Sequence, residues 1–154
     1  MKTSARLAAL LLLAALVSAC ASKQIVTSSI GSSASAEEYL GYVRGQNGLS
    51  RARPDARLEK AAEQQARYMA QTARMVHTTG RGRDFATRMK ANDVSGPAAE
   101  NIAHGGMDLP KLFQMWVDSP PHRKNMLDPR FARFGLGSAT AADGKRYWAL
   151  VLGE

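Results

Sequence analysis

The chain has 154 residues, a formal net charge of +8 and a hydrophobic content of 45%. This length fits one domain with a sizeable core, and the hydrophobic content excludes a wholly disordered chain. The positive charge favours anionic partners, which in a cytosolic protein would suggest nucleic acid. The first residues argue against that compartment, so we expect no nucleic-acid partner.

The N-terminal segment has the pattern of an export signal. Lys2 and Arg6 precede an apolar run that extends from Leu7 to Val17. This run is too short for a transmembrane helix, which needs about 20 apolar residues. We therefore expect residues 1–19 to be removed as a signal peptide.

The end of this segment, Val17-Ser-Ala-Cys20, resembles a bacterial lipobox, in which the cysteine becomes the lipidated first residue of the mature chain. Cys20 is the only cysteine, so we predict that it carries an acyl group such as palmitate and anchors the protein to a membrane. Plain secretion, with cleavage after the small residues, is the alternative. Both routes place the domain outside the cytosol, and neither allows an internal disulfide. Ala21 in place of Asp resembles the sorting signal for the outer membrane, in a cell that has one.

Residues 20–34 are predicted to form the lipidated cysteine and a flexible tether, because residues 21–34 are mostly small and polar. The domain is then expected to occupy residues 35–154. Ser35 and Glu38 have the spacing of a capping box and predict a helix that stops near Gly45 and Gly48.

Aspartates precede three further predicted helices. Asp55 is expected to cap a helix whose inward face combines small and long apolar side chains at helical spacing. Asp84 and Asp108 are expected to cap two shorter helices, the second of which ends at Pro120-Pro121. The predicted inward residues are Leu58, Ala62, Gln65, Met69 and Ala73 in the first of these helices and Leu109, Leu112, Phe113 and Trp116 in the last.

The last third of the chain predicts a β-hairpin. Residues 134–139 and 146–152 resemble strands, and Asp143-Gly144 between them is a turn signal. Helices followed by strands indicate an α+β fold, in which helices cover an antiparallel sheet. Trp116 and Trp148 are expected in its core.

The chemistry-bearing side chains concentrate between Pro97 and Asn125, where Glu100, Ser119 and His122 occur. If the fold adds His77, two imidazoles and a carboxylate could form a metal site or an acid–base site. Ser119, His122 and Glu100 also permit a hydrolytic triad. No Gly-x-Ser-x-Gly pattern surrounds Ser119, however, and a serine before two prolines is more often a helix cap.

Several segments together resemble the CAP superfamily of cysteine-rich secretory, antigen 5 and pathogenesis-related proteins, in particular its short bacterial branch. The likeness covers roughly residues 36–154. The most specific part is Glu100-Asn-Ile-Ala103 followed at the family's distance by Trp116-Val-Asp-Ser-Pro-Pro-His-Arg-Lys-Asn125. Weaker matches are Asn47 with Leu58 and Ala61-Ala62, Met75-Val-His77-Thr, Phe85 with Arg88, Phe134-Gly-Leu-Gly137, and Tyr147-Trp with Leu152-Gly153.

The resemblance implies an α–β–α sandwich with a cleft formed by two histidines and two acidic residues. His77 and His122 match the histidines and Glu100 matches the first acid, whereas Ser119 stands where the second acid is expected. The resemblance also implies Zn²⁺ or another divalent cation bound by these residues; a hydrogen-bonded polar cluster is the alternative. Asn101 and Asn125 are expected to bond to loop backbone, and His104 to lie on the surface.

These features predict a monomeric lipoprotein of the cell envelope that binds a ligand in a cleft of His77, Glu100, Ser119 and His122. Candidate ligands are anionic or amphipathic, such as lipid, lipopolysaccharide, peptidoglycan or another envelope protein. The alternative is a metal-dependent hydrolase that acts on envelope material through His77, Glu100 and His122. A purely structural role is the third possibility.

Overall fold

The computed structural model describes residues 26–154. The predicted signal peptide, the lipobox with Cys20 and the first residues of the predicted tether lie outside this range. Among the described residues, no helix combines the length and the apolar character needed to span a bilayer.

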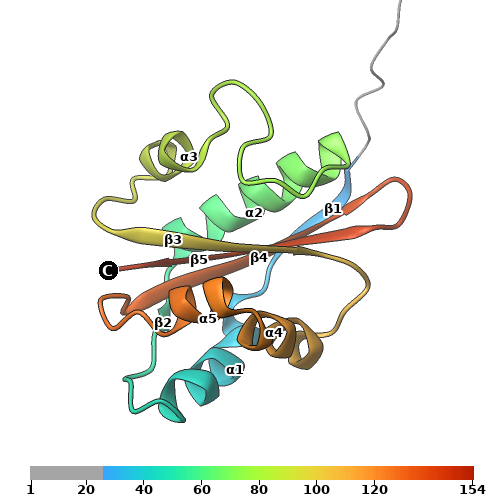
Figure 1. Cartoon of the computed structure of the whole chain (residues 1–154). Helices are drawn as coiled ribbons and strands as arrows, with labels where there is room; N and C mark the ends of the chain where they lie inside the picture. Colours follow the sequence, from blue (N-terminus) through green and yellow to red (C-terminus); the bar gives the residue numbers. More distant parts are fainter. Residues whose placement is uncertain (1–25) are drawn as a thin grey trace, which may run out of the picture.

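Five strands and five helices make up the described chain (Figure 1). In chain order the elements are β1 (Val26–Gly31), α1 (Ser33–Gly45), β2 (Arg53–Pro54), α2 (Ala56–Thr72), α3 (Phe85–Ala91), β3 (Ala98–His104), α4 (Leu109–Asp118), α5 (Pro120–Met126), β4 (Arg133–Ala141) and β5 (Arg146–Gly153).

The strands form one sheet in the order β1-β4-β5-β3, with antiparallel neighbours, and the short β2 pairs in parallel with β4. The predicted hairpin is confirmed: β4 and β5 flank a turn in which Gly144 has φ +80° and Asp143 accepts a hydrogen bond from the Lys145 amide. This backbone conformation favours glycine, which explains the turn signal in the sequence.

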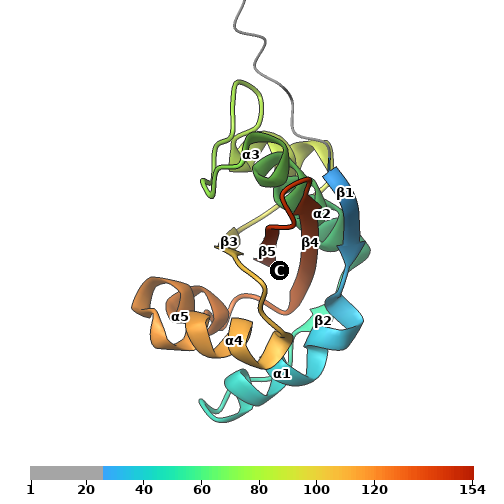
Figure 2. The ribbon, with the colours of Figure 1, turned by 90° about the vertical axis from the view of Figure 1, so that its right-hand side faces the viewer.

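Helices cover both faces of the sheet, as Figure 2 shows: α2 and α3 lie on one side and α1, α4 and α5 on the other. The predicted α–β–α sandwich is therefore confirmed. Alternate residues of β5 serve the two cores, since Trp148 and Leu150 pack with α1 and α4 whereas Tyr147 and Ala149 pack with α2. This is the period of two that a strand buried on both faces requires.

Glycine allows α2 to lie directly on the sheet. A β-carbon built on Gly135 would collide with the α2 backbone at Glu59, and one built on Gly137 would collide with that backbone at Glu63. The two glycines of the Phe134-Gly-Leu-Gly137 segment thus set the distance between helix and sheet.

The structure corrects the predicted tether. Residues 26–31 pair with β4 as an edge strand, so the domain begins before residue 35. The predicted capping box is also wrong, because α1 already begins at Ser33, whose hydroxyl accepts a hydrogen bond from the Leu136 amide. This bond ties the start of the helix to the sheet, in place of a local cap.

The three aspartate caps are confirmed. Asp55, Asp84 and Asp108 each accept hydrogen bonds from backbone amides of the first turn of their helices. The predicted inward face of α2 is buried except for Ala73, which lies beyond the helix end with φ 51° and is exposed.

Pro120 and Pro121 do more than end a helix. They follow the end of α4 and form the first turn of α5, where a missing amide hydrogen removes no helical bond.

Candidate functional site

A buried ion pair lies between α3 and β3. Arg88 and Glu100 form a two-pronged contact, with distances of 2.8 Å from Nη1 to Oε2 and 3.0 Å from Nη2 to Oε1. The side chains of Arg88 and Glu100 are only 1% and 3% exposed. Two charges withdrawn from water in this way need such close pairing.

His77 contacts this ion pair from the loop after α2. Its Nδ1 lies 2.9 Å from Glu100 Oε1, and its backbone carbonyl accepts a bond of 3.2 Å from Arg88 Nη2. The side-chain amide of Gln65 holds the same loop by donating to the Val76 carbonyl at 2.7 Å. The His77 side chain is nevertheless 55% exposed, so a fixed imidazole faces solvent.

His122 lies in α5, and its Nδ1 is 2.8 Å from Ser119 Oγ. The Asn101 side chain donates to the His122 carbonyl at 3.0 Å, and Asn125 donates to Asn101 Oδ1 at 2.9 Å. Asn125 also donates to the Glu100 carbonyl at 3.5 Å, so both asparagines bond to backbone as predicted, although this backbone belongs to α5 and β3 and not to a loop. Together the amides fix α5 to β3, the strand that carries Glu100.

The surroundings of His122 change its pKa. Burial lowers the pKa of His122, and the nearby positive charge that His77 can carry lowers it further. His122 therefore favours the neutral form near pH 7, in which one ring nitrogen accepts a hydrogen bond and the other donates one.

A hollow of about 320 Å³ adjoins the Ser119–His122 pair. Apart from these two residues and His104, its lining is apolar and comes from the loop after α2, from β3 and from α4: Met75, Ile102, Ala103 and Met115. His104 is exposed, as predicted, and it also lines this hollow. The hollow, His77 and the Arg88–Glu100 pair make up what we call the cleft.

Arg88 is the charged residue of the cleft that sequence reasoning did not assign to the site; the residues of the hollow other than Ser119 and His122 were not assigned to it either. Glu100 and His77 form one hydrogen-bonded group with Arg88, and Ser119 and His122 form a second. Two features of the sequence could have pointed to Arg88. It occurs with Phe85 in the family pattern, and Glu100, an acid in an otherwise apolar strand, requires a positively charged partner.

These contacts do not favour the predicted three-residue metal site. Among the described residues, no group of three or more His, Cys, Asp or Glu side chains is arranged to hold a metal ion. Both Glu100 oxygens are occupied by Arg88 and His77. The carboxylate thus orients an imidazole, and the site does not fit Zn²⁺ held by His77, Glu100 and His122 together.

The hydrolytic triad is not formed either. Ser119 does contact His122, but Glu100, the predicted orienting acid, bonds to His77. A catalytic triad requires the acid on the same imidazole as the serine.

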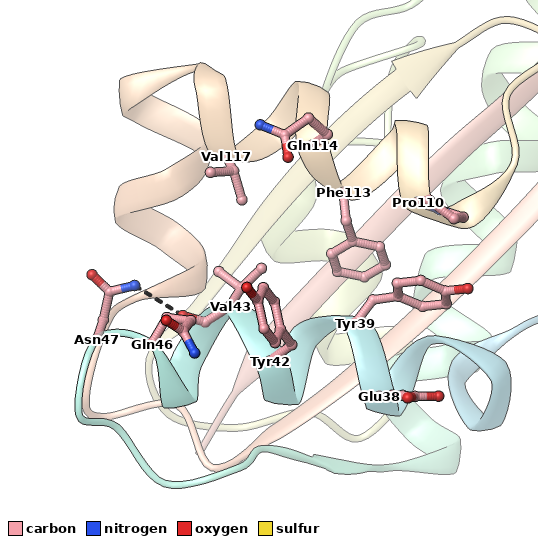
Figure 3. A pocket seen from close by; sticks show the side chains of 10 residues that line it. All are labelled: Glu38, Tyr39, Tyr42, Val43, Gln46, Asn47, Pro110, Phe113, Gln114 and Val117. Carbon is pink, nitrogen blue, oxygen red and sulfur yellow. Dashed lines mark hydrogen bonds between the residues drawn. The ribbon is translucent and has the colours of Figure 1, made fainter.

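A second hollow, of about 470 Å³, lies between α1 and α4 and is separate from the cleft (Figure 3). We call it the α1–α4 groove. Tyr39 and Phe113 stack there with ring centroids 5.9 Å apart, and Tyr42 stands beside them. The sequence patterns gave no indication of this groove, because its residues come from two helices that are far apart in the chain.

The fold and the cleft define a class of protein: an α–β–α sandwich in which a buried acid orients one of two histidines. Residues 38–152 match the cysteine-rich secretory protein family, CAP. The chain belongs to this family, and the predicted resemblance is confirmed.

The chain is also similar to YkwD, an uncharacterized protein of Bacillus subtilis (strain 168), with 31% identity over 125 residues. That match covers 77% of this chain and 49% of YkwD, so the chain spans about half the length of this curated relative.

Among solved structures, an outer surface protein of Borrelia burgdorferi has a TM-score of 0.70 at 20% identity, over 82% of this chain and 97% of that one. An extracellular SCP-domain protein of Bacillus anthracis gives 0.67 at 21% identity, over 79% of this chain and 40% of that one. These likenesses concern the fold.

Proposed function

We propose that this CAP protein is exported, is anchored to a membrane by a lipid on Cys20 (the outer membrane in a cell that has one), and binds an amphipathic envelope ligand in its cleft. The N-terminal pattern supports export and lipidation. The outer surface and extracellular descriptions of the structural neighbours agree with export. The cleft provides the binding chemistry.

The observation that carries the proposal is the buried Arg88–Glu100 pair behind the exposed His77. Burying two charges costs desolvation energy, and apolar residues of similar volume often stabilise a core as well or better. Here the ion pair also fixes an imidazole that faces solvent. An ordered hydrogen-bonding group on the surface is what recognition of a polar ligand group requires.

The rest of the cleft indicates the ligand's second half. The hollow beside His122 is lined mainly by Met75, Ile102, Ala103 and Met115. Methionine side chains adapt to irregular apolar shapes. A polar head on the imidazoles and an apolar part in this hollow would satisfy both surfaces. The net charge of +8 for the whole chain, which becomes 8 − 2 = +6 once Lys2 and Arg6 of the predicted signal peptide are removed, favours an anionic head.

Vesicle binding tests the proposal. Residues 23–154 should sediment with vesicles that contain phosphatidylglycerol or lipid A, and increasing salt should weaken this binding. His77→Ala should reduce it at least about tenfold with little change in melting temperature, because the imidazole is 55% exposed. Tyr42→Ala, in the separate α1–α4 groove, is the matched control and should bind as wild type does.

Loss of binding in Tyr42→Ala with full binding in His77→Ala would exclude the cleft. The hydrolase alternative is tested by adding Zn²⁺ and envelope lipid to the same samples and measuring hydrolysis of the lipid. This alternative requires hydrolysis by the wild type that both His77→Ala and His122→Ala abolish.

A further inference from the structure

Two exposed methionines flank the hollow of the cleft. The large hydrophobic side chains that are exposed among the described residues are Ile30, Tyr42, Met75 and Met115, and both methionines of this set line that hollow. Met75 is 43% exposed and Met115 is 37% exposed. They come from the loop after α2 and from α4, so the fold and not the local sequence brings them to the same hollow.

Both methionines project from ordered backbone. The residue after Met75 is held because the Val76 carbonyl accepts a hydrogen bond of 2.7 Å from the buried Gln65. Met115 belongs to α4, which is packed into the core through the fully buried Trp116. The two thioether groups are therefore held beside an open hollow, where a small solute can reach them without any change in the fold.

The other methionines of the described chain are protected. Met69 and Met126 are 0% exposed and Met89 is 6% exposed. Met107 is half-buried and packs against the core between the sheet and α4, outside the hollow. A solute from water reaches a buried sulfur only when the structure opens locally, so exposure separates the two methionines of the hollow from the rest.

We propose that Met75 and Met115 form a reversible oxidation site that sets the polarity of the hollow. With hydrogen peroxide as oxidant, a lone pair of the thioether sulfur forms an S–O bond while the O–O bond breaks, and water leaves. The sulfur is oxidised by two electrons to a sulfoxide, and the peroxide is reduced. A thiol-dependent sulfoxide reductase reverses the step, because two thiols become a disulfide and the oxygen leaves as water.

Oxidation would change what the hollow can bind. In the reduced protein its lining combines the two methionines with Ile102 and Ala103, which suit an apolar group. A sulfoxide is polar, and burying it beneath an apolar group costs free energy unless it finds a donor. His104 and His122 belong to the same lining and can donate to a sulfoxide oxygen. The oxidised hollow thus favours water over the apolar part of a ligand.

The site itself is tested by oxidising residues 23–154, a piece that contains every described element, with dilute hydrogen peroxide. Mass spectrometry of proteolytic fragments then gives the oxidation rate of each methionine. Met75 and Met115 should oxidise at least about tenfold faster than the buried Met69 and Met126. In urea, where the fold is lost, the rates should become similar.

The consequence for binding rests on the proposed function and is tested with the phosphatidylglycerol vesicles. Peroxide should weaken binding by the wild type about fivefold or more, and a sulfoxide reductase with thiol should restore it. The double variant Met75→Leu with Met115→Leu has no thioether in the hollow, so peroxide should leave its own affinity, whatever that is, unchanged. Met107→Leu is the matched control and should keep the sensitivity of the wild type.

A readout without vesicles keeps this inference separate from the proposed function. Oxidation should shift the imidazole NMR signals of His104 and His122 in the wild type and leave them in place in the double variant. If the wild type binds no vesicles, the proposed function fails and these signals decide the inference. It is overturned if Met75 and Met115 oxidise no faster than the buried methionines, if the signals do not move, or if peroxide weakens the double variant as much as the wild type.

Discussion

Arg88 and Glu100 decide both the stability of the cleft and the position of His77. Each is almost completely buried and each is the other's charged partner, so removal of either one leaves an uncompensated charge in the interior. The pair is a long-range contact between α3 and β3, which local sequence patterns do not reveal. Glu100 itself was predictable because it belongs to a specific family motif.

Arg88→Ala should therefore destabilise the fold by about 3–5 kcal/mol, measured by urea unfolding. The double variant Arg88→Met with Glu100→Leu should recover most of this loss, because it removes both charges. Although its stability recovers, the double variant should bind vesicles more weakly than the wild type does, because His77 loses the carboxylate that orients it. Equal stability of Arg88→Ala and wild type would show that the pair is solvated in solution.

His122 predicts a pH dependence of stability. Its pKa in the folded protein is lowered from 6.5 by burial and by His77, so the unfolded state binds protons more readily. Stability should be unaffected above the unfolded pKa of about 6.5 and should fall as pH drops below it. Asp128 does not contribute to this change, because its pKa is lowered to about 2 and it is protonated only at much lower pH.

Urea unfolding between pH 7.5 and 5 would measure this dependence. His122→Gln, which keeps a polar side chain of similar size, should show a flatter profile over this range. A wild-type profile that matches the variant would mean that His122 titrates normally in the folded protein.

At the scale of elements, features that depend on residues close together in the sequence were predicted, and features that depend on distant residues were not. Asp55, Asp84 and Asp108 cap their own helices, and all three were found because a cap and its amides are near neighbours in sequence. β1 was missed because Val26–Gly31 lacks an apolar alternation and owes its structure to pairing with β4. The start of α1 was misplaced for the same reason.

The contact between α2 and the sheet gives a prediction about glycine. Gly135→Ala places a methyl group against the backbone of α2, which cannot move aside as a side chain could. We expect a loss of about 1–3 kcal/mol or more in urea unfolding. Gly106→Ala is the matched control, because a β-carbon there meets nothing within 4 Å, and it should leave stability nearly unchanged.

At the scale of the molecule, α4 contributes to two separate hollows. Met115 of α4 lines the hollow of the cleft beside Ser119 and His122, whereas Phe113 and Gln114 of the same helix line the α1–α4 groove. The architecture was predictable from the order of helices and strands and from the family resemblance. The groove was not, because it depends on how two helices with ordinary amphipathic patterns pack together.

The extent of the domain can be tested by truncation. Residues 32–154 lack β1 and expose the edge of β4, so this piece should be less stable than residues 23–154 by at least about 2 kcal/mol, given several lost backbone hydrogen bonds. Thermal melting of the two pieces measures the difference. Identical melting curves would instead support the flexible tether first expected for residues 26–31.

The incorporation of β1 into the sheet also sets how far an anchored domain can reach. Between a lipid on Cys20 and Val26, where β1 begins, only five residues remain. At about 3.3–3.6 Å per fully extended residue, a linker of this length spans less than about 20 Å. With the proposed lipid in place, the domain would stay close to the bilayer surface, and it could bind only ligands that diffuse to that surface or belong to it.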